Sequence, residues 1–535
     1  MSARRLAAEL AADPSVGAGN VLTSLLAKGA GAGQPALTFD SAVAGHPAWQ
    51  ALTLGGLHRL TASRAAALRA LGVVRRDPVV IAFSTAADYA LTFLALARLG
   101  AIPALVNPGL PPETAATYIR RLRATGLVSD AATLARWAGH DLGVPVLATP
   151  TDLDAGDHAA APAPFAHHGE DPVAITHSSG TTALPKAVVH SHHSLYAAIR
   201  YRLTLPRPQG SERMLSALPV PHAAMLIALN LGLSSGSEVL MLSRQTGPGI
   251  LDAIERWRPR SVVGFSATWA NLAGEDLPAR DLSSVALWWN TGDCAHEAHI
   301  RNLVAHGQRQ AVTARGREVV PGSVFVDGLG SSEMGHSHFY IAHTADTNRY
   351  GRCIGRPHPF AQVAVIGPDG QELGPGEIGE LGTRSPTLAL GYWNDSVTTY
   401  RTRIGGYFLT GDLVYTDEDG YFYHLDRKLD TVDLGDGEFL YTAATEERLL
   451  ARCPDVRDCT VVAVSENGQV RTEVLLELAP GADPAADRDA AVREALGPRA
   501  AATLRGVTVV PGDRIPLTPT GKVRKVALRE QLGAR

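Results

Sequence analysis

Residues 174–190, AITHSSGTTALPKAVVH, combine a cluster of hydroxyl side chains and glycine with a lysine close behind it. An apolar, strand-like run enters the cluster, and a second β-branched run follows Lys186. Backbone N–H groups and hydroxyls around a glycine can converge on phosphate oxygens, and a lysine adds a positive charge that reaches them. The strand–loop–lysine–strand order therefore predicts a phosphate-binding loop rather than a polar surface turn. It is not a Walker loop, because GxxxxGK[ST] does not occur in the chain. The loop residues expected to bind phosphate are Ser178, Ser179, Gly180, Thr181, Thr182 and Lys186.

Further polar segments follow in a fixed order. They are LPVPHAAML at 218–226, GLGSSEMG at 328–335, TGD at 410–412 with DEDGY at 417–421, DRKLD at 426–430 and PLTPTGKVRK at 516–525. Together with the first loop, which differs by Ala183 in place of the usual glycine, they resemble the signature motifs of the adenylate-forming superfamily. That superfamily includes acyl-CoA and aryl-CoA ligases, stand-alone adenylation domains and luciferases. The resemblance spans about residues 55–525, nearly the whole chain.

The resemblance implies an ATP-dependent reaction in which a carboxylate attacks the α-phosphorus, forming an acyl adenylate and releasing pyrophosphate. Negative charge then needs screening on both sides of the reacting phosphorus. The residues implied as catalytic are Lys522, Glu333, His222 and Thr181. Those implied in nucleotide binding, besides the loop, are Gly330, Ser331, Ser332, Glu333, Asp412, Arg427 and Lys522. Glu333 and Thr182 are the implied Mg²⁺ ligands, since Mg²⁺ prefers oxygen.

The substrate pocket is expected around His222, Trp289, Gly292, Asp293 and Gly328. Pro221 and His222 offer no carboxylate for an α-ammonium group, which disfavours an ordinary α-amino acid. Indoles at Trp288 and Trp289 consume pocket volume and disfavour a long fatty-acyl tunnel, although strand alternation lets only one face inward. The expected substrate is a small carboxylic acid, aromatic or otherwise polar-substituted.

Three departures from the family pattern affect the second half-reaction and the nucleotide pocket. Leu329 replaces the adenine-stacking tyrosine, and Leu429 replaces the polar hinge residue. Asp433 stands where CoA-using long-chain ligases often carry lysine. CoA is the first acceptor considered, with a carrier protein or a nitrogen nucleophile, forming an amide or an N–N bond, as the alternative. A non-catalytic nucleotide-binding protein is a more distant alternative, because Lys186, Glu333, Asp412 and Lys522 are all retained.

Two other patterns imitate active sites. Residues 232–236, GLSSG, match the GxSxG nucleophile elbow around Ser234, but LGLSSGSEVLML reads as a helix end, a turn and a strand. His296 and His299 lack the HExxH spacing of a zinc protease. We interpret these two, with His190, His192 and His193, as surface or loop histidines.

These motifs need elements that position them. Helix-like runs at 60–72 and 87–100 alternate with apolar strand-like runs at 78–84 and 101–109, which predicts an α/β fold with parallel sheet. From about Arg356, short alternating runs divided by DG and PG turns predict an antiparallel, β-rich subdomain. Strands at 460–467 and 472–479 and a helix at 485–497 follow a polar junction. We therefore expect a large N-terminal domain, residues 1–425, of parallel and mixed sheets with helices, and a small mobile α+β domain, residues 426–535.

Composition narrows the remaining possibilities. Forty-nine Lys and Arg against 53 Asp and Glu give a net charge of −4, with no electrostatic basis for binding nucleic acid or an anionic membrane. Four scattered cysteines with no CxxC pair favour a reducing compartment. Glu9 and Asp13 interrupt any signal sequence, and the apolar runs are too short to span a bilayer. A cytoplasmic location is expected.

Overall fold

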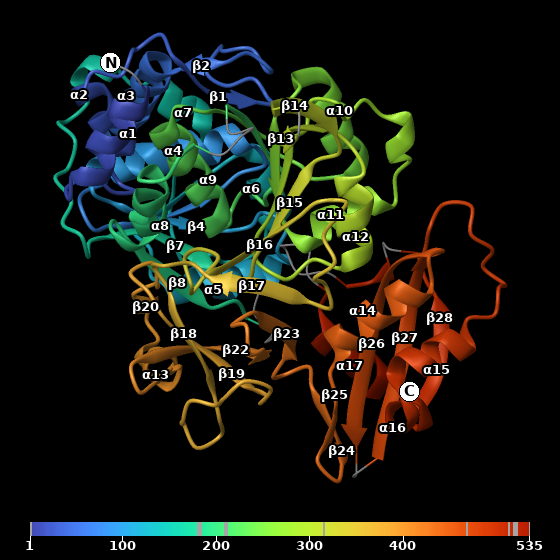
Figure 1. Cartoon of the computed structure of the whole chain (residues 1–535). Coiled ribbons are helices and arrows are strands. Elements are labelled where there is room, and N and C mark those ends of the chain that lie inside the picture. The colour runs from blue at the N-terminus through green and yellow to red at the C-terminus, as the bar shows by residue number, and fades with distance from the viewer. Residues whose placement is uncertain are drawn as a thin grey trace.

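The computed structural model describes residues 3–178, 184–207, 212–313, 316–466, 469–511, 514–516 and 523–533. A large N-terminal body carries two extended sheets, and a smaller C-terminal body, red in Figure 1, packs beside it. No helix in the described ranges is both long and apolar enough to cross a membrane. All four cysteines are buried and free.

The first sheet contains, in spatial order, β20 (Gly391–Tyr392), β8 (Ala187–Ser191), β7 (Pro172–His177), β4 (Ile102–Leu105), β3 (Pro78–Ala82), β5 (Gly126–Ser129) and β6 (Val146–Ala148). Its centre is parallel, and β8 and β20 add antiparallel strands at one edge. Along β3, Val79 and Ile81 join one core cluster while Val80 and Ala82 join another. Strand alternation therefore buries both faces, as the continuous apolar run predicts.

The second sheet runs through β18 (Gln362–Ile366), β19 (Gly379–Arg384), β22 (Tyr407–Thr416), β23 (Phe422–Arg427), β17 (Cys353–Pro357), β16 (Phe339–His343), β15 (Val324–Asp327), β12 (Leu287–Asn290), β11 (Ser261–Gly264), β9 (Arg213–Ser216), β10 (Glu238–Met241), β1 (Pro35–Phe39) and β2 (Leu52–Thr53), with β21 (Arg403–Ile404) beside β22. The strands from β1 to β15 are parallel, whereas those from β16 to β18 are antiparallel. This change to antiparallel strands agrees with the antiparallel, β-rich subdomain that the sequence predicts from about Arg356.

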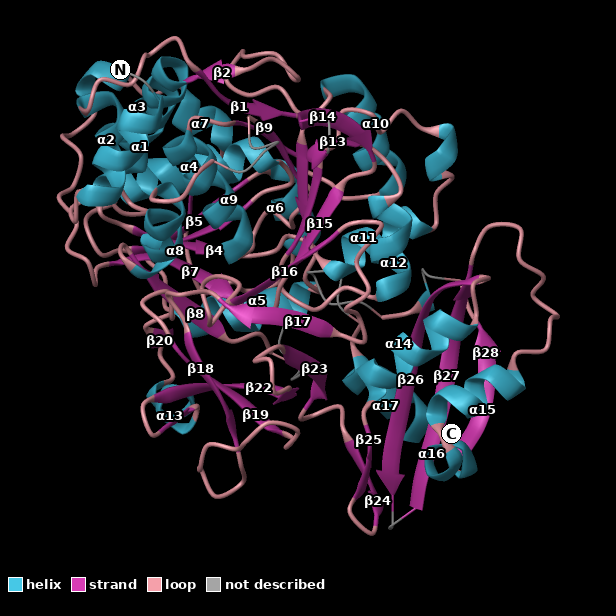
Figure 2. Cartoon of the chain, viewed as in Figure 1, coloured by secondary structure: helices cyan, strands magenta, loops and turns pink. Residues whose placement is uncertain are grey.

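Helices fill the space between the two sheets and cover their outer faces (Figure 2). The inner layer is α1 (Ala3–Ala12), α2 (Val21–Ala27), α3 (Leu54–Ala70), α4 (Ala86–Leu99), α8 (Ser194–Leu203) and α9 (Ala223–Ser235). The outer helices are α5 (Pro112–Leu122) and α6 (Ala131–Trp137) on the first sheet, and α10 (Gly247–Trp257), α11 (Ser266–Ala273) and α12 (Glu297–Val304) on the second. The remaining elements of this body are α7 (Pro150–Asp154), α13 (Ser396–Arg401) and the hairpin of β13 (Gln308–Thr313) and β14 (Gly316–Pro321).

Helix α4 shows how the sequence sets these elements. Thr85 accepts a hydrogen bond from the Asp88 N–H and caps the start, and Gly100 ends the helix at φ 72°. A Cβ at Gly100 would also lie 2.6 Å from the Phe165 ring. Nearly every side chain between these two caps is buried, as expected for a helix that is apolar on all sides. The predicted helix at 87–100 is confirmed.

The C-terminal body has its own core, which includes Leu449, Val461, Val474 and Val492. Its elements are β24 (Val432–Gly435), β25 (Glu438–Leu440), α14 (Thr442–Arg452), β26 (Val456–Glu466), β27 (Gln469–Leu478), α15 (Asp489–Leu496), α16 (Pro498–Ala502), β28 (Leu504–Val509) and α17 (Lys525–Gly533). The predicted boundary between residues 425 and 426 falls inside β23, which ends at Arg427. The α/β fold with a smaller α+β C-terminal unit is confirmed.

Candidate active site

A cavity of about 580 Å³ lies where the two bodies meet. Of the residues predicted from the sequence, it brings together Ser178, Lys186, His222, Gly292, Asp293, Gly330, Ser331, Ser332, Glu333 and Arg427. Trp289, Gly328 and Asp412 are not among its lining residues. Trp289 and Gly328 lie in or next to β12 and β15, and Asp412 in β22 directly follows the lining residue Gly411. Ser179, Gly180, Thr181, Thr182 and Lys522 lie outside the described residues.

Asp412 and Arg427 form one end of the site. They face each other across β22 and β23, and Arg427 Nη1 donates to Asp412 Oδ1 at 2.7 Å. His424 Nε2 lies 3.4 Å from the same oxygen. Burial alone would raise the pKa of Asp412, but the charge of Arg427 and the His424 contact outweigh it and hold that pKa below its usual range. The carboxylate is therefore ionised and suited to accept hydrogen bonds from hydroxyl groups.

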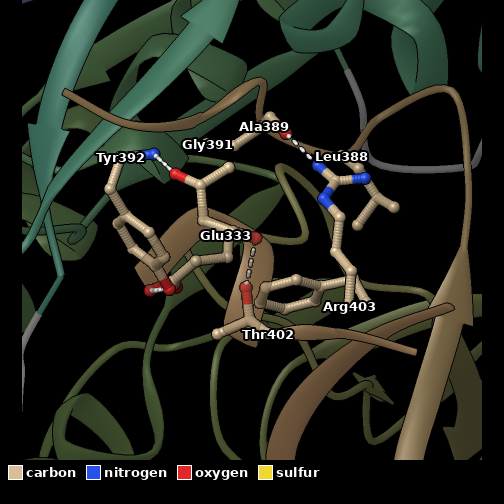
Figure 3. A pocket seen from close by; sticks show the side chains of 9 residues that line it. Glu333, Leu388, Ala389, Gly391, Tyr392, Thr402 and Arg403 are labelled. Carbon is tan, nitrogen blue, oxygen red and sulfur yellow. Dashed lines mark hydrogen bonds between the residues drawn. The ribbon is translucent and has the colours of Figure 1, made fainter. Parts of the chain in front are cut away.

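Tyr392 contacts both Glu333 and Lys186. The sequence analysis did not predict Tyr392 as a site residue. The Tyr392 hydroxyl donates to Glu333 Oε1 at 3.0 Å, and Lys186 Nζ lies 5.2 Å from the Tyr392 ring centroid. Figure 3 shows Glu333 and Tyr392 together beside a small pocket that Thr402 and Arg403 also line. Nothing in the spacing marks Tyr392, since only the pairing of β20 with β8 brings it to Lys186.

A buried polar network fixes the ends of β12 and β15. Asp327 accepts hydrogen bonds from Asn290 Nδ2 at 2.6 Å, Gly328 N–H at 2.8 Å and Ala295 N–H at 3.2 Å. Burial nevertheless raises the pKa of Asp327 to about 6. Because the network holds the 293–295 turn against the end of β15, it positions the cavity wall without lining it. Sequence analysis missed Asp327 and Asn290, which carry no motif signal beyond their place next to predicted residues.

Two glycine segments approach closely at this wall. The Gly330 N–H donates to the Gly292 carbonyl at 2.8 Å. A Cβ at Gly330 would lie 2.9 Å from the Ser337 backbone, so a larger residue would push residues 330 and 337 apart. Glycine at 330 is thus required by contact rather than by a turn.

Asp293 extends from this wall toward Arg352. Its Oδ1 accepts from the Cys294 N–H at 2.9 Å and lies 3.5 Å from Arg352 Nη2. Arg352 is buried and also contacts His424 Nδ1 at 2.7 Å. Arg352 and His424 thus connect Asp293 to Asp412.

His222 caps the start of α9. Its Nδ1 accepts from the Ala224 N–H at 3.1 Å, which assigns the ring proton to Nε2, and Nε2 lies 3.2 Å from Ser332 Oγ. The ring also packs edge-on against Phe265 at 4.9 Å between centroids. The predicted pairing of the 218–226 and 328–335 segments at one site is therefore seen directly.

The two patterns that imitate active sites, the GxSxG match and the histidines, have structural explanations. Ser234 lies in the last turn of α9, where its hydroxyl pairs with the Tyr196 hydroxyl at 2.8 Å. The interpretation of the histidines as surface or loop residues is wrong for His190 in β8 and His299 in α12, which are buried. His192 lies in the turn after β8, as a loop residue, but is buried as well. Burial lowers the pKa of each to about 4, so they are neutral packing residues.

The C-terminal body is held over the cavity by polar contacts. Glu447 on α14 pairs with His296 Nδ1 at 2.6 Å and accepts from the Glu297 N–H at 3.0 Å. Within the C-terminal body itself, Lys525 at the start of α17 pairs with Glu446 on α14 at 2.8 Å. Residues 523–526 line the cavity, so the segment that follows Lys522 lies at the site. Within the described ranges no group of three or more His, Cys, Asp or Glu could hold a metal by itself.

Comparison with known proteins agrees with this geometry. The AMP-binding enzyme family matches residues 27–393. A 3-aminoavenalumate diazotase from a Streptomyces species is 46% identical over 87% of this chain and 84% of its own length. A 3-amino-2-hydroxy-4-methoxybenzoate diazotase from Streptomyces cremeus is 27% identical, covering 80% and 81%, and a feruloyl-CoA synthase from an Amycolatopsis species is 28% identical, covering 90% and 94%. The crystal structure of an anthranilate CoA ligase with anthranoyl-AMP has the same fold, with TM-score 0.81 over the full length of both chains at 21% identity.

Proposed function

The chain belongs to the AMP-binding enzyme family of ligases and adenylating enzymes, and from this premise we propose that it is a diazotase that joins nitrite nitrogen to an aromatic amine. The observation that carries the proposal is the 46% identity to a diazotase over 87% of the chain. Asp433 supports it, because this residue replaces the lysine of CoA-using long-chain ligases in the exposed hairpin of β24 and β25. The proposed diazotase function implies that the acceptor is a nitrogen nucleophile and that an N–N bond forms.

The chemistry fits a site for adenylation of an oxyanion. Nitrite has the bent O–N–O⁻ shape of a carboxylate, so one oxygen can attack the α-phosphorus of ATP while the bond to pyrophosphate breaks. The product is a mixed anhydride of nitrous acid and AMP. The amine lone pair then attacks the nitroso nitrogen, the N–O bond to AMP breaks, and AMP leaves with its electron pair. The two amine hydrogens then move to the nitroso oxygen, which leaves as one water and gives the diazonium ion, so the sequence needs no oxidant or reductant.

The residues that the motifs imply divide this work between them. Asp412 and Arg427 hold the ribose hydroxyls, and Lys186 and the 178–182 loop hold the phosphates. Glu333 is a suitable Mg²⁺ ligand, since Mg²⁺ binds proteins through one or two carboxylates together with phosphates and waters. Bound there with Thr182, Mg²⁺ would neutralise phosphate charge. Lys522 would neutralise the charge that develops at the α-phosphate.

A second candidate retains the reaction expected first: a small aromatic acid is activated at its own carboxylate and passed to CoA. The feruloyl-CoA synthase, at 28% identity over 90% of the chain, favours it. In both candidates the enzyme works in the cytoplasm on a small aromatic carboxylic acid, without nucleic acid or membrane.

One experiment separates the candidates. Purified protein is incubated with ATP, Mg²⁺ and 3-aminocinnamate, with or without nitrite and with or without CoA. AMP and pyrophosphate are measured, and diazonium is trapped by azo coupling to a naphthol. We expect nitrite-dependent AMP, pyrophosphate and azo dye, with ¹⁵N from labelled nitrite in the dye. Nitrite-independent AMP with a CoA thioester would replace the diazotase proposal by the second candidate, and ADP formation would refute both.

A further inference from the structure

Arg202, in the last turn of α8, is a half-buried cation that lacks an anion in the described part of the chain. Its Nε is fully buried and has no hydrogen-bond partner. By contrast, the fully buried Arg64 pairs with Asp88 and Asp154, each at 2.7 Å. Burial lowers the pKa of Arg202 to about 10, which leaves the guanidinium charged at neutral pH. A desolvated charge without a counterion is costly, so its retention points to a ligand that supplies the counterion.

Neutral rings surround this charge. The Arg202 Cζ lies 4.2 Å from the Trp289 ring centroid. The Phe360 ring packs against His336 at 5.8 Å and stacks on His358 at 5.0 Å. Burial, with the charge of Arg202, lowers the pKa of His336 well below its usual value and that of His358 to about 3. We call Arg202, Trp289, His336, His358 and Phe360 the Arg202 cluster; at neutral pH its single charge is on Arg202.

The Arg202 cluster adjoins the cavity through two segments of chain. Trp289 lies three residues before Gly292 on the β12 segment, and His336 lies three residues after Glu333. Gly292 and Glu333 both line the cavity, and Thr291 Oγ1 bonds to Ser337 Oγ at 2.8 Å between the two segments. A chain advances by at most about 3.6 Å per residue, so three residues span no more than about 11 Å. Trp289 and His336 are therefore no farther from these lining residues than an aromatic ring with a short spacer can span.

We propose that Arg202 binds the carboxylate of an aromatic amine substrate, at the end opposite the amine that reacts. The inference rests on the proposed diazotase function, because only there is the substrate's carboxylate a spectator rather than the reacting group. The substrate class is an aminoaryl carboxylate whose carboxylate is carried beyond the ring on a spacer. Guanidinium binds carboxylate with two parallel hydrogen bonds, and Trp289 gives the substrate ring an apolar surface. The names of both similar diazotases are those of amino-substituted carboxylates, which agrees with an anionic substrate. The benzoate carries its carboxylate directly on the ring, so the spacer rests on the position of Arg202 alone.

The test compares 3-aminocinnamate with its neutral amide, 3-aminocinnamamide, at saturating ATP and nitrite. Wild-type protein should prefer the acid by about 50-fold in kcat/KM, as expected for charge-assisted hydrogen bonds in a buried site. Arg202→Gln should lower kcat/KM for the acid to the level of the amide, with the amide constants and the ATP KM unchanged. Arg202→Lys should recover part of the preference, because it keeps the charge but loses the planar fork.

Arg213 provides the matched control. Its Cζ lies 4.1 Å from the Trp257 ring centroid, so it too is an arginine over an indole, but Glu238 pairs with it at 3.3 Å. Arg213→Gln should leave the preference for the acid intact. Equal losses for acid and amide in Arg202→Gln, or a wild-type enzyme that does not discriminate, would overturn the proposal. If Arg202→Gln does not fold, the wild-type ratio of acid to amide still decides.

A binding measurement separates this proposal from the proposed function. Calorimetric titration of 3-aminocinnamate into the protein, without ATP or nitrite, should show binding that Arg202→Gln weakens by at least tenfold. If wild-type protein makes no diazonium but shows this difference, the diazotase function fails and the carboxylate site stands. If diazonium forms while acid and amide bind alike to both proteins, the carboxylate site fails and the diazotase function stands.

Discussion

Asp412 and Arg427, which the proposed function assigns to the nucleotide, already pair with each other, whereas Arg202 has no such partner among the described residues. Asp293 and Arg352 continue the paired pattern at 3.5 Å. Ribose hydroxyls are neutral, so they need an acceptor held in place in advance rather than a free charge. An anionic substrate, in contrast, can complete an ion pair that the protein leaves open. Under the proposed function, internal pairing would thus prepare one region for a constant nucleotide, and the unpaired cation would select the variable substrate.

The largest effect is expected at Lys522, whose charge should pair with the negative charge that develops at the α-phosphate in the transition state. Lys522→Ala should lower nitrite-dependent pyrophosphate release by about 100-fold or more, while the dissociation constant for ATP changes less than threefold. The reason is that the charge contact develops chiefly at the transition state. Stopped assays of pyrophosphate and calorimetric ATP binding measure the two quantities. Arg505→Ala, on exposed β28 of the same body, should change neither. An equal loss of ATP binding would make Lys522 a ground-state ligand.

Breaking the pair at the nucleotide end should have the next largest effect. Asp412→Asn removes the charge that Arg427 pairs with and one of the expected ribose acceptors, so the KM for ATP should rise about tenfold. The KM for the aromatic substrate at saturating ATP should change less than twofold. Asp417→Asn is the control, because Asp417, in the turn after β22, pairs with Arg349 before β17, and neither residue lines the cavity. If the aromatic substrate suffers as much as ATP, the two ends are not separable.

Asp293 lies between the two ends and sharpens the comparison. Asp293→Ala should raise the KM for the aromatic substrate about fivefold and that for ATP less than twofold, because the side chain extends from the wall beside Gly292. Steady-state titration of each substrate measures both. Collapse of ATP binding with an unchanged aromatic profile would instead assign Asp293 to the adenine.

The smallest expected effect concerns the closure of the two bodies over the cavity. Burial opposes charge on His296, but the Glu447 hydrogen bond and charge raise the pKa of His296 above its reference of 6.5. Burial likewise opposes ionisation of Glu447, whose pKa is nevertheless held below its reference of 4.5 by His296. The histidine contribution is complete below about pH 6.5 and is lost as pH rises through the raised pKa. The glutamate contribution is present above about pH 4.5 and is lost as pH falls through the lowered one.

The pair therefore stabilises the protein most between about pH 4.5 and 6.5. His296→Gln should lower the Tm by about 2–4 °C in that window and by less at pH 9. Calorimetric melting across pH measures this difference. Arg301→Gln breaks a partly exposed pair with Glu297 and a contact over the Tyr350 ring, neither of which involves His296 or Glu447, so it should show no such window. A pH-independent difference for His296→Gln would mean that packing, not charge, provides the contact.

Much of the fold and of the candidate site could be predicted from sequence patterns, because each of these patterns lies within a short segment of the chain. The apolar runs at 78–84 and 87–100 predict β3 and α4, and capping by Thr85 and Gly100 needs only neighbouring residues. The ordered motifs likewise predict that His222, Glu333 and Arg427 share a site, and all three line the cavity. The burial of His190 and His192 could not be predicted, because a polar side chain is expected to be exposed unless a sheet or a packed helix covers it.

The sequence by itself determined the family and the α/β fold with its smaller C-terminal unit, and it predicts the residues of the phosphate loop and its companion motifs. These follow from periodicity and from motifs in which each residue is near its partners along the chain. The tertiary structure alone decided that Tyr392 joins Lys186 to Glu333, that Asp327 fixes the cavity wall, and that Arg202 lies over Trp289 with no anion among the described residues. Each of these relations joins segments tens to more than two hundred residues apart, and charge neutralisation at such a distance depends on which side chains folding buries together.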